Sequence, residues 1–154
     1  MGLDMYLYRE TYIWRHGDNP PTLTVDYPGI QTERVCHIDE KVGYWRKANA
    51  IHQWFVDNVQ GGEDRCQKSH VSKEAFEKLL DTVTKVQADH KLASELLPTT
   101  VGFFFGNTDY DSYYFDDLED TRKILEATLA EIQGEADAGK DRVLRADYYY
   151  QASW

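Results

Sequence analysis

The apolar and polar positions of the chain alternate near both ends and follow a helical period in the middle. Over 3–14, leucine and methionine occupy every second position between polar and tyrosine residues, which is the spacing of a strand with one buried face. The carboxyl-terminal segment 142–154 has a similar pattern. Shorter strands are predicted over 22–25, 33–42 and 101–105, with the two terminal strands as candidate neighbours.

Between these strands, apolar residues recur every three or four positions in three segments. They predict helices over 44–60, 72–97 and 116–133, and Ser72 is a suitable N-cap for the second of them. Strands at the ends and helices in the middle favour an α+β fold, in which about three helices pack on one face of a mainly antiparallel sheet. The length suits a single domain over 1–154.

Composition narrows the class of protein. Lys and Arg number 17 against 27 Asp and Glu, and this net charge of −10 argues against general nucleic-acid binding and against docking on anionic lipid. No apolar run has the length of a membrane span, and nothing in the first residues resembles a signal peptide. Two cysteines, Cys36 and Cys66, are too few for a disulfide scaffold. We therefore expect a cytoplasmic protein.

The strongest candidate binding residues lie at the start of the first predicted helix. There Trp45, Asn49 and His52 fall on one helical face, with Arg46 and Lys47 beside it. Guanidinium groups bind phosphate through paired hydrogen bonds, and aromatic rings stack on bases, so this set suits a nucleotide-type ligand. The plainer interpretation makes Trp45 a core residue, Arg46 and Lys47 solvated, and His52 a hydrogen-bonded histidine of the interior.

A second candidate segment follows the predicted strand 101–105. Asn107, Thr108 and Asp109 offer groups for a ribose or a base edge, and Tyr110 offers a ring for stacking. A polar turn with a tyrosine-rich surface explains the same residues without a ligand.

The carboxyl end adds a further ring, that of Trp154. Tyrosine and tryptophan are favoured on binding surfaces, but strands also favour aromatic residues for packing alone. Trp154 is therefore a candidate stacking residue for the base and equally a residue of an aromatic sheet.

Acidic residues concentrate late in the chain. Residues 107–141 contain 11 acidic and three basic side chains, so we expect an anion site near the sheet and the first helix. A calcium loop does not fit, because its glycine and glutamate positions hold Tyr114 and Asp120. No phosphate loop, dinucleotide fingerprint or nucleophile elbow occurs in the sequence, and we predict neither a metal nor a cofactor.

Four segments carry a resemblance to a known group of proteins. MGLDMYL at 1–7, GYWRKANAIHQWF at 43–55, the run 103–114 and YYYQASW at 148–154 resemble a family of small phage and prophage proteins. The resemblance brings no catalytic residues with it. By analogy of size and acidity, it suggests a viral protein that captures a nucleotide immune signal inside the host cell.

Together these observations lead to a main hypothesis and two alternatives. The main one is a non-enzymatic binder that sequesters a nucleotide-derived signal, an ADP-ribose derivative or a cyclic oligonucleotide, in a pocket at a homodimer or higher oligomer interface. The first alternative is a hydrolase of such a signal, with His52 as general base oriented by Asp109. The second is an inhibitor of a host factor, in which acidic residues 109–120 mimic nucleic acid.

Overall fold

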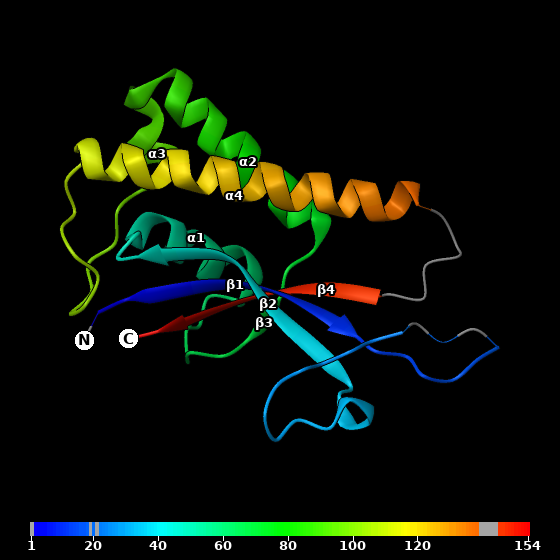
Figure 1. Ribbon diagram of the computed structural model, residues 1–154. Coiled ribbons are helices and arrows are strands. Elements are labelled where there is room, and N and C mark those ends of the chain that lie inside the picture. The colour runs from blue at the N-terminus through cyan, green and yellow to red at the C-terminus, as the bar shows by residue number, and fades with distance from the viewer. Residues whose placement is uncertain (1, 19, 21, 139–144) are drawn as a thin grey trace.

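The computed structural model describes residues 2–18, 20, 22–138 and 145–154, and Figure 1 shows their arrangement. Four strands form one antiparallel sheet in the order β2-β1-β4-β3: β1 Asp4–Tyr12, β2 His37–Arg46, β3 Ser69–His70 and β4 Arg145–Ser153. Four α-helices are α1 Asn49–Val59, α2 Lys73–Ala88, α3 Ala93–Leu96 and α4 Ser112–Asp137, with short 3-10 helices at Thr32–Arg34 and His90–Leu92. The α+β class and the antiparallel sheet are thereby confirmed.

Strand β1 lies at the centre of the sheet because both of its edges find long partners. Its apolar residues Met5 and Leu7 are fully buried, and the tyrosines between them turn to the opposite face. Met5 is opposite Ala152, and Leu7 is opposite Tyr150, so the two terminal strands are neighbours, as the alternating pattern suggested. Register follows from this pattern, since a slip of one residue would expose the apolar set.

All four α-helices cover the same face of the sheet, and α4 runs along it above α1 and β2 (Figure 1). The core lies between the two layers and is formed by Met5, Leu7, Phe55, Leu118 and other apolar residues from every long element. Among the described helices, none is both long and apolar enough to span a membrane. Sheet and helices thus form the two layers in which an α+β domain buries its apolar faces.

The predicted start of the helix over 44–60 is wrong. Strand β2 continues to Arg46, because Gly43 and Trp45 face the core while Tyr44 faces away, a period of two. Lys47 has a φ of 59°, which breaks the strand, and α1 begins at Asn49. Trp45 therefore shares no helical face with Asn49; its indole N–H donates to the Thr121 hydroxyl at 2.8 Å inside the core.

Two expected strands are absent from the described chain. Residues 22–25 form no ladder, and 101–105 form a turn in which Val101 and Phe103 are 86% and 95% exposed. Both segments are apolar enough for a strand, but none of the strands in the described parts of the chain lies beside them to pair with. The strand expected over 33–42 begins later, at His37, because Thr32–Arg34 forms a 3-10 turn.

The other helix limits also shift. The helix that Ser72 caps ends at Ala88 and is followed by separate short turns up to Leu96, so the expected 72–97 helix is interrupted. The helix expected over 116–133 starts at Ser112, because Asp111 accepts a hydrogen bond from the Tyr114 backbone N–H as its N-cap. Residues 142–144 of the last expected strand lie outside the described residues.

Candidate functional site

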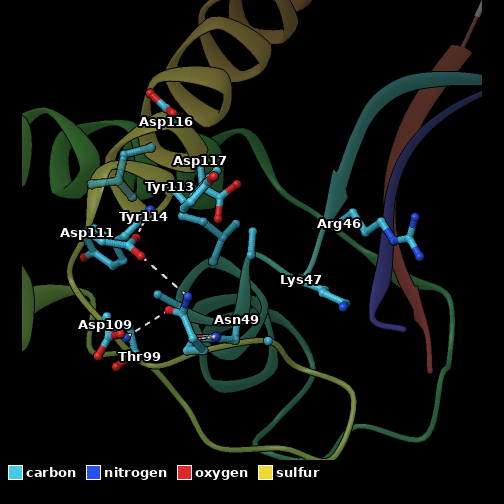
Figure 2. A pocket seen from close by; sticks show the side chains of 16 residues that line it. Arg46, Lys47, Asn49, Thr99, Asp109, Asp111, Tyr113, Tyr114, Asp116 and Asp117 are labelled. Atoms are coloured by element: carbon cyan, nitrogen blue, oxygen red, sulfur yellow. Dashed lines mark hydrogen bonds between the residues drawn. The ribbon is translucent and has the colours of Figure 1, made fainter. Parts of the chain in front are cut away.

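A pocket with a volume of about 290 Å³ lies where the end of β2, the start of α1, the loop before α4 and the start of α4 meet (Figure 2). We call it the α1–α4 pocket. Its lining comprises Arg46, Lys47, Ala48, Asn49, Ala50, Ile51, Thr99, Gly106, Asn107, Asp109, Asp111, Tyr113, Tyr114, Asp116, Asp117 and Leu118. The structure thus brings five of the predicted binding residues together, namely Arg46, Lys47, Asn49, Asn107 and Asp109.

Asn49 shapes this pocket by holding the loop before α4. Its side-chain amide donates to the carbonyls of Phe105 and Asn107, each at 2.9 Å, and its side-chain oxygen accepts from the Thr100 backbone N–H at 2.9 Å. Only 5% of the residue is exposed. We expected Asn49 to bond a ligand, but the amide is already committed to the backbone, so it positions the wall instead.

The charge of the pocket differs from our expectation that the anion site would lie away from the acidic segment 107–141. Four carboxylates line it, those of Asp109, Asp111, Asp116 and Asp117. The side chains of Arg46 and Lys47 point away from them in Figure 2, and Arg46 lies 4.0 Å from Asp4 of the neighbouring strand. Asp109 and Asp111 come from the loop before α4, and Asp116 and Asp117 from its second turn, so these acids reach the pocket because this part of the chain forms one of its walls.

Asp117 is the most perturbed of these acids. Burial, followed by the charges of Asp120, Asp116 and Asp111, raises the pKa of its carboxyl to about 7. Near neutral pH, Asp117 is therefore protonated in a large fraction of molecules. In that form it is a hydrogen-bond donor rather than a negative charge.

Replacing Asp117 with asparagine should stabilise the protein at pH 8 by about 1–2 kcal/mol more than at pH 5. The folded protein at pH 5 retains a proton that the unfolded chain loses near pH 3.8. The stability that this proton contributes is complete below pH 3.8 and is lost as the pH rises to about 7, whereas asparagine does not titrate. Thermal unfolding at both pH values measures the difference, with Asp57→Asn on an exposed surface of α1 as the control. Equal gains at both pH values would contradict it.

Two helices begin at the α1–α4 pocket. The first turn of α4 is capped by Asp111, whereas α1 follows Ala48, which has no side-chain group to cap it. The first N–H groups of α1 are therefore without a capping side chain among the described residues. A helix start of this kind attracts anions, because its N–H groups carry partial positive charge.

His52 lies behind the pocket rather than in it. The residue is 1% exposed, its Nδ1 is 2.7 Å from the Tyr150 hydroxyl, and its Nε2 is 3.0 Å from the Asp64 carboxylate. Burial lowers the pKa of His52 below its usual 6.5, although Asp64 opposes this shift. The proposed pairing of His52 with Asp109 is therefore wrong, since Asp64 and Tyr150 take both ring nitrogens. The plainer interpretation, a hydrogen-bonded interior histidine, is correct.

The predicted stacking residues also lie outside the pocket lining. Trp45 is buried in the core, and the Tyr110 hydroxyl accepts from the Thr99 backbone N–H at 3.3 Å. The indole N–H of Trp154 donates to Asp64 at 2.6 Å. These rings therefore do not converge, and Tyr113, 74% exposed at the edge of the pocket, is the better stacking candidate.

Thr108, expected to bond a base or ribose, also does not line the pocket. Its backbone carbonyl accepts from the Thr99 hydroxyl at 2.9 Å, so it helps to fix the loop. Asp111, Tyr113 and Asp117 also line the pocket, although the sequence pattern did not indicate them as binding residues. The position of Asp111 three residues before Tyr114 is an N-cap spacing, and this signal could have placed the helix start and these side chains correctly.

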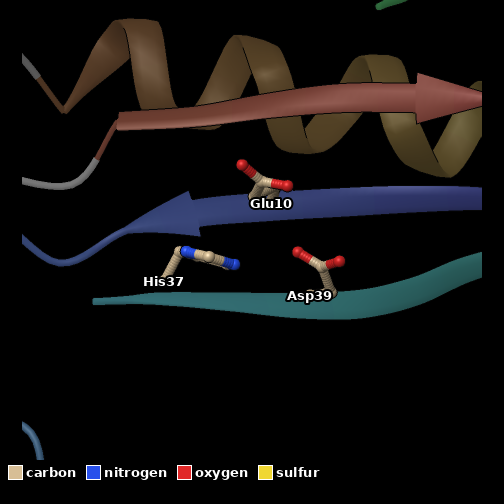
Figure 3. Close-up of side chains that lie close together, drawn as sticks. All are labelled: Glu10, His37 and Asp39. Carbon is tan, nitrogen blue, oxygen red and sulfur yellow. The ribbon is translucent and has the colours of Figure 1, made fainter. Parts of the chain in front are cut away.

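A separate cluster on β1 and β2 has the residue types of a metal site. Ligand atoms of Glu10, His37 and Asp39 all lie within 4.8 Å of one another (Figure 3). The Lys68 ammonium, however, bonds Glu10 at 2.6 Å and Asp39 at 2.9 Å. Because Lys68 already neutralises both carboxylates, a metal ion would have to displace it.

Comparison of the chain with protein-family models, with curated proteins and with solved structures gave no match. Its function has to be inferred from the geometry of the α1–α4 pocket.

Proposed function

We propose that the protein binds a nucleotide-derived ligand in the α1–α4 pocket and sequesters it without turnover. One observation carries this proposal. The uncapped start of α1 and the carboxyl groups at the start of α4 line the same pocket. A nucleotide carries the matching pair of groups, an anionic phosphate and a hydroxyl- and amine-bearing nucleoside. The capture of a host immune signal, which the phage resemblance implies, is part of the proposal.

The phosphate would lie at the start of α1, where the N–H groups of Ala50 and Ile51 and the Lys47 side chain are within the lining. Asp117 supports such a position in its protonated form, because a carboxylic acid donates a hydrogen bond to phosphate. An anion beside it favours the protonated form still further. Binding should therefore take up a proton.

The nucleoside would lie toward α4. Carboxylates of Asp109 and Asp111 accept hydrogen bonds from ribose hydroxyls or an exocyclic amine, and the exposed ring of Tyr113 can stack on the base. The volume of about 290 Å³ is near the lower end of ligand-binding cavities. One nucleotide unit suits this volume, and a larger signal would extend beyond the rim.

Sequestration is favoured over hydrolysis because His52, the base of the hydrolase hypothesis, is buried between Tyr150 and Asp64. One observation makes a hydrolase the second candidate function. Asp117 lines the pocket with a pKa of about 7, the range required of a general acid or base at neutral pH. Recovery of product rather than intact ligand would support the hydrolase.

We expect the purified protein to retain an added nucleotide and to release it intact on heating. AMP, ADP-ribose and cyclic di-adenylate are suitable probes, each incubated with the protein, filtered, and identified by mass spectrometry in the heated retentate. Retention should increase from pH 8 to pH 6, because protonation of Asp117 removes a negative charge beside the phosphate. Retention of none of the three, with no thermal shift, would overturn the proposal.

Two charge-reversal variants, one at the pocket and one away from it, test whether binding depends on this pocket. Lys47→Glu at the pocket should weaken binding about 10-fold or more, the effect of roughly 1.4 kcal/mol. Lys73→Glu makes the same change at the start of α2, where an acid is tolerated, and should leave binding unchanged. Equal weakening by both variants would indicate attraction by general charge rather than by this pocket.

A further inference from the structure

Strands β1 and β2 carry three metal-ligating side chains on the face of the sheet that turns away from the helices. Glu10 is directly opposite Asp39, and His37 lies two residues before Asp39 on the same face. One ligand atom of each residue lies within 4.8 Å of the other two, and Figure 3 shows the His37 ring turned toward the Asp39 carboxylate. We call Glu10, His37 and Asp39 the β1–β2 cluster. No spacing along the chain indicates this set, because only the pairing of β1 with β2 brings Glu10 to the other two.

The β1–β2 cluster offers one imidazole nitrogen and two carboxylates. This set suits a divalent transition-metal ion such as zinc, whereas magnesium and calcium prefer oxygen ligands alone. Around a zinc ion, with bonds of about 2.0–2.2 Å, the ligand atoms lie roughly 3–4 Å apart, so small rotations of the three side chains are sufficient to complete the site. Three protein ligands leave a fourth position for water.

The second ring nitrogen of His37 also has a partner. Its Nδ1 lies 3.3 Å from the Cys36 sulfur, which leaves Nε2 for a metal ion. Histidines that bind metals almost always use their other ring nitrogen as a hydrogen-bond donor, which fixes the tautomer and the orientation of the ring. When Nδ1 donates to the Cys36 sulfur, the lone pair of Nε2 is available to the metal.

The charges around the β1–β2 cluster favour a cation. Glu10 is opposite Asp39 on one side and Asp147 on the other, so three carboxylates form a row across β2, β1 and β4. Like charges directly opposite one another destabilise a sheet. A single ammonium group, that of Lys68, bonds Glu10 at 2.6 Å and Asp39 at 2.9 Å. Among the described side chains of this row, negative charge therefore remains in excess.

Lys68 competes with a metal ion for the cluster. It bonds only Oε2 of Glu10 and Oδ2 of Asp39, so in the described part of the chain the second oxygen of each carboxylate makes no hydrogen bond or ion pair. The lysine side chain is 30% exposed, and ion pairs of such partly exposed groups contribute little. A divalent ion that gains three ligands at once should displace the ammonium, which keeps its contact with the Tyr149 ring at 4.8 Å as an alternative.

We propose that the β1–β2 cluster binds a divalent transition-metal ion, with zinc as the representative, and that Lys68 bonds the two carboxylates when no metal is bound. None of the three ligands belongs to the lining of the α1–α4 pocket, so the proposal does not depend on nucleotide binding. The ion would join β1 to β2. Because the site forms only when these strands pair, metal binding should also stabilise the folded chain.

Isothermal titration calorimetry with zinc chloride tests the site in the tag-free, chelator-treated chain. One zinc ion should bind per chain with a Kd on the order of 10 µM, and magnesium should bind at least about 100-fold more weakly. His37→Gln should weaken zinc binding about 10-fold or more. Lys68→Gln should strengthen it about 10-fold, because the competing ammonium is removed. Misfolding of the variant cannot produce this gain.

The matched control is His70→Gln. His70 is exposed and lies 3.5 Å from a single carboxylate, that of Asp147, so its loss should change zinc affinity by less than about 2-fold. Circular dichroism of each variant checks that the fold is retained. Absence of zinc binding up to about 200 µM, equal weakening by His37→Gln and His70→Gln, magnesium binding as tight as that of zinc, or no gain in Lys68→Gln would each overturn the proposal.

Discussion

Replacing His52 with alanine should lower the free energy of unfolding by about 3–5 kcal/mol at pH 7. The side chain is 1% exposed and lies between the Tyr150 hydroxyl and the Asp64 carboxylate. Its removal leaves a cavity, deprives the buried Tyr150 hydroxyl of its partner, and removes one of the donors to the Asp64 carboxylate, which keeps those of Trp154 and the Cys66 backbone. Both losses cost free energy, because neither group can regain full hydration in the folded state.

The position of this chain of hydrogen bonds explains why the effect is large. The neutral imidazole accepts from the Tyr150 O–H and donates to Asp64, which is the tautomer that satisfies both neighbours. It thereby connects α1, the terminal strand β4 and the loop before β3. Tyr150 also stacks on Phe55 with ring centres 4.0 Å apart, so the same residues form part of the core.

Urea unfolding followed by tryptophan fluorescence measures this loss. Tyr150→Phe removes only the hydroxyl and should cost about 1–2 kcal/mol. His70→Ala is the matched control, since His70 is exposed and lies 3.5 Å from Asp147; its effect should stay within about 0.5 kcal/mol. A His52→Ala variant within about 1 kcal/mol of the unmodified chain would show that the hydrogen bonds contribute little.

His52 also determines how the stability of the protein changes with pH. Because burial lowers the pKa of His52, the unfolded chain binds a proton below about pH 6.5 that the folded protein does not bind. Stability should therefore fall as pH decreases below that value. Asp117 acts in the opposite sense, since its raised pKa favours the folded state at lower pH. Substitution of His52 should remove the first trend and leave the second.

Local pattern was sufficient to predict the elements that bury one face. The alternation around Met5 and Leu7 placed β1, and the helical period after Ser72 placed α2 with its cap. The local pattern failed where pairing with another strand determines the conformation of a segment. Trp45 fits a helix and a strand equally well in isolation, and its pairing with Met5 selects the strand. Phe103 fits a strand, but among the described residues no strand lies beside it.

The candidate site was harder to predict because its parts come from distant segments. Arg46, Lys47 and Asp109 do meet in one pocket, as their residue types suggested. The pocket is more acidic than we expected, because the loop before α4 and the second turn of that helix bring four aspartates beside the start of α1. Similarly, His52 is 98 residues from Tyr150 in the sequence, and no spacing rule links the two.

Replacing Asn49 with aspartate should destabilise the protein by about 2–4 kcal/mol, although the two side chains have nearly the same shape. The amide nitrogen donates to the carbonyls of Phe105 and Asn107, and a carboxylate oxygen in its place would face two acceptors. The bond from the Thr100 backbone N–H would survive. Repulsion at a position that is 5% exposed should therefore release the loop from α1.

Hydrogen exchange over residues 99–107 and urea unfolding together measure this change. Asn58→Asp is the control on the same helix, because Asn58 is exposed and its side-chain oxygen accepts from Lys78, a bond that an aspartate retains. It also donates to the Trp54 carbonyl, but water can replace that bond at an exposed position, so the effect should remain within about 1 kcal/mol. Since Asn49 forms the wall of the α1–α4 pocket, its variant should lose ligand retention together with loop protection. Loss of stability with an unchanged exchange rate in the loop would mean that other contacts hold this wall.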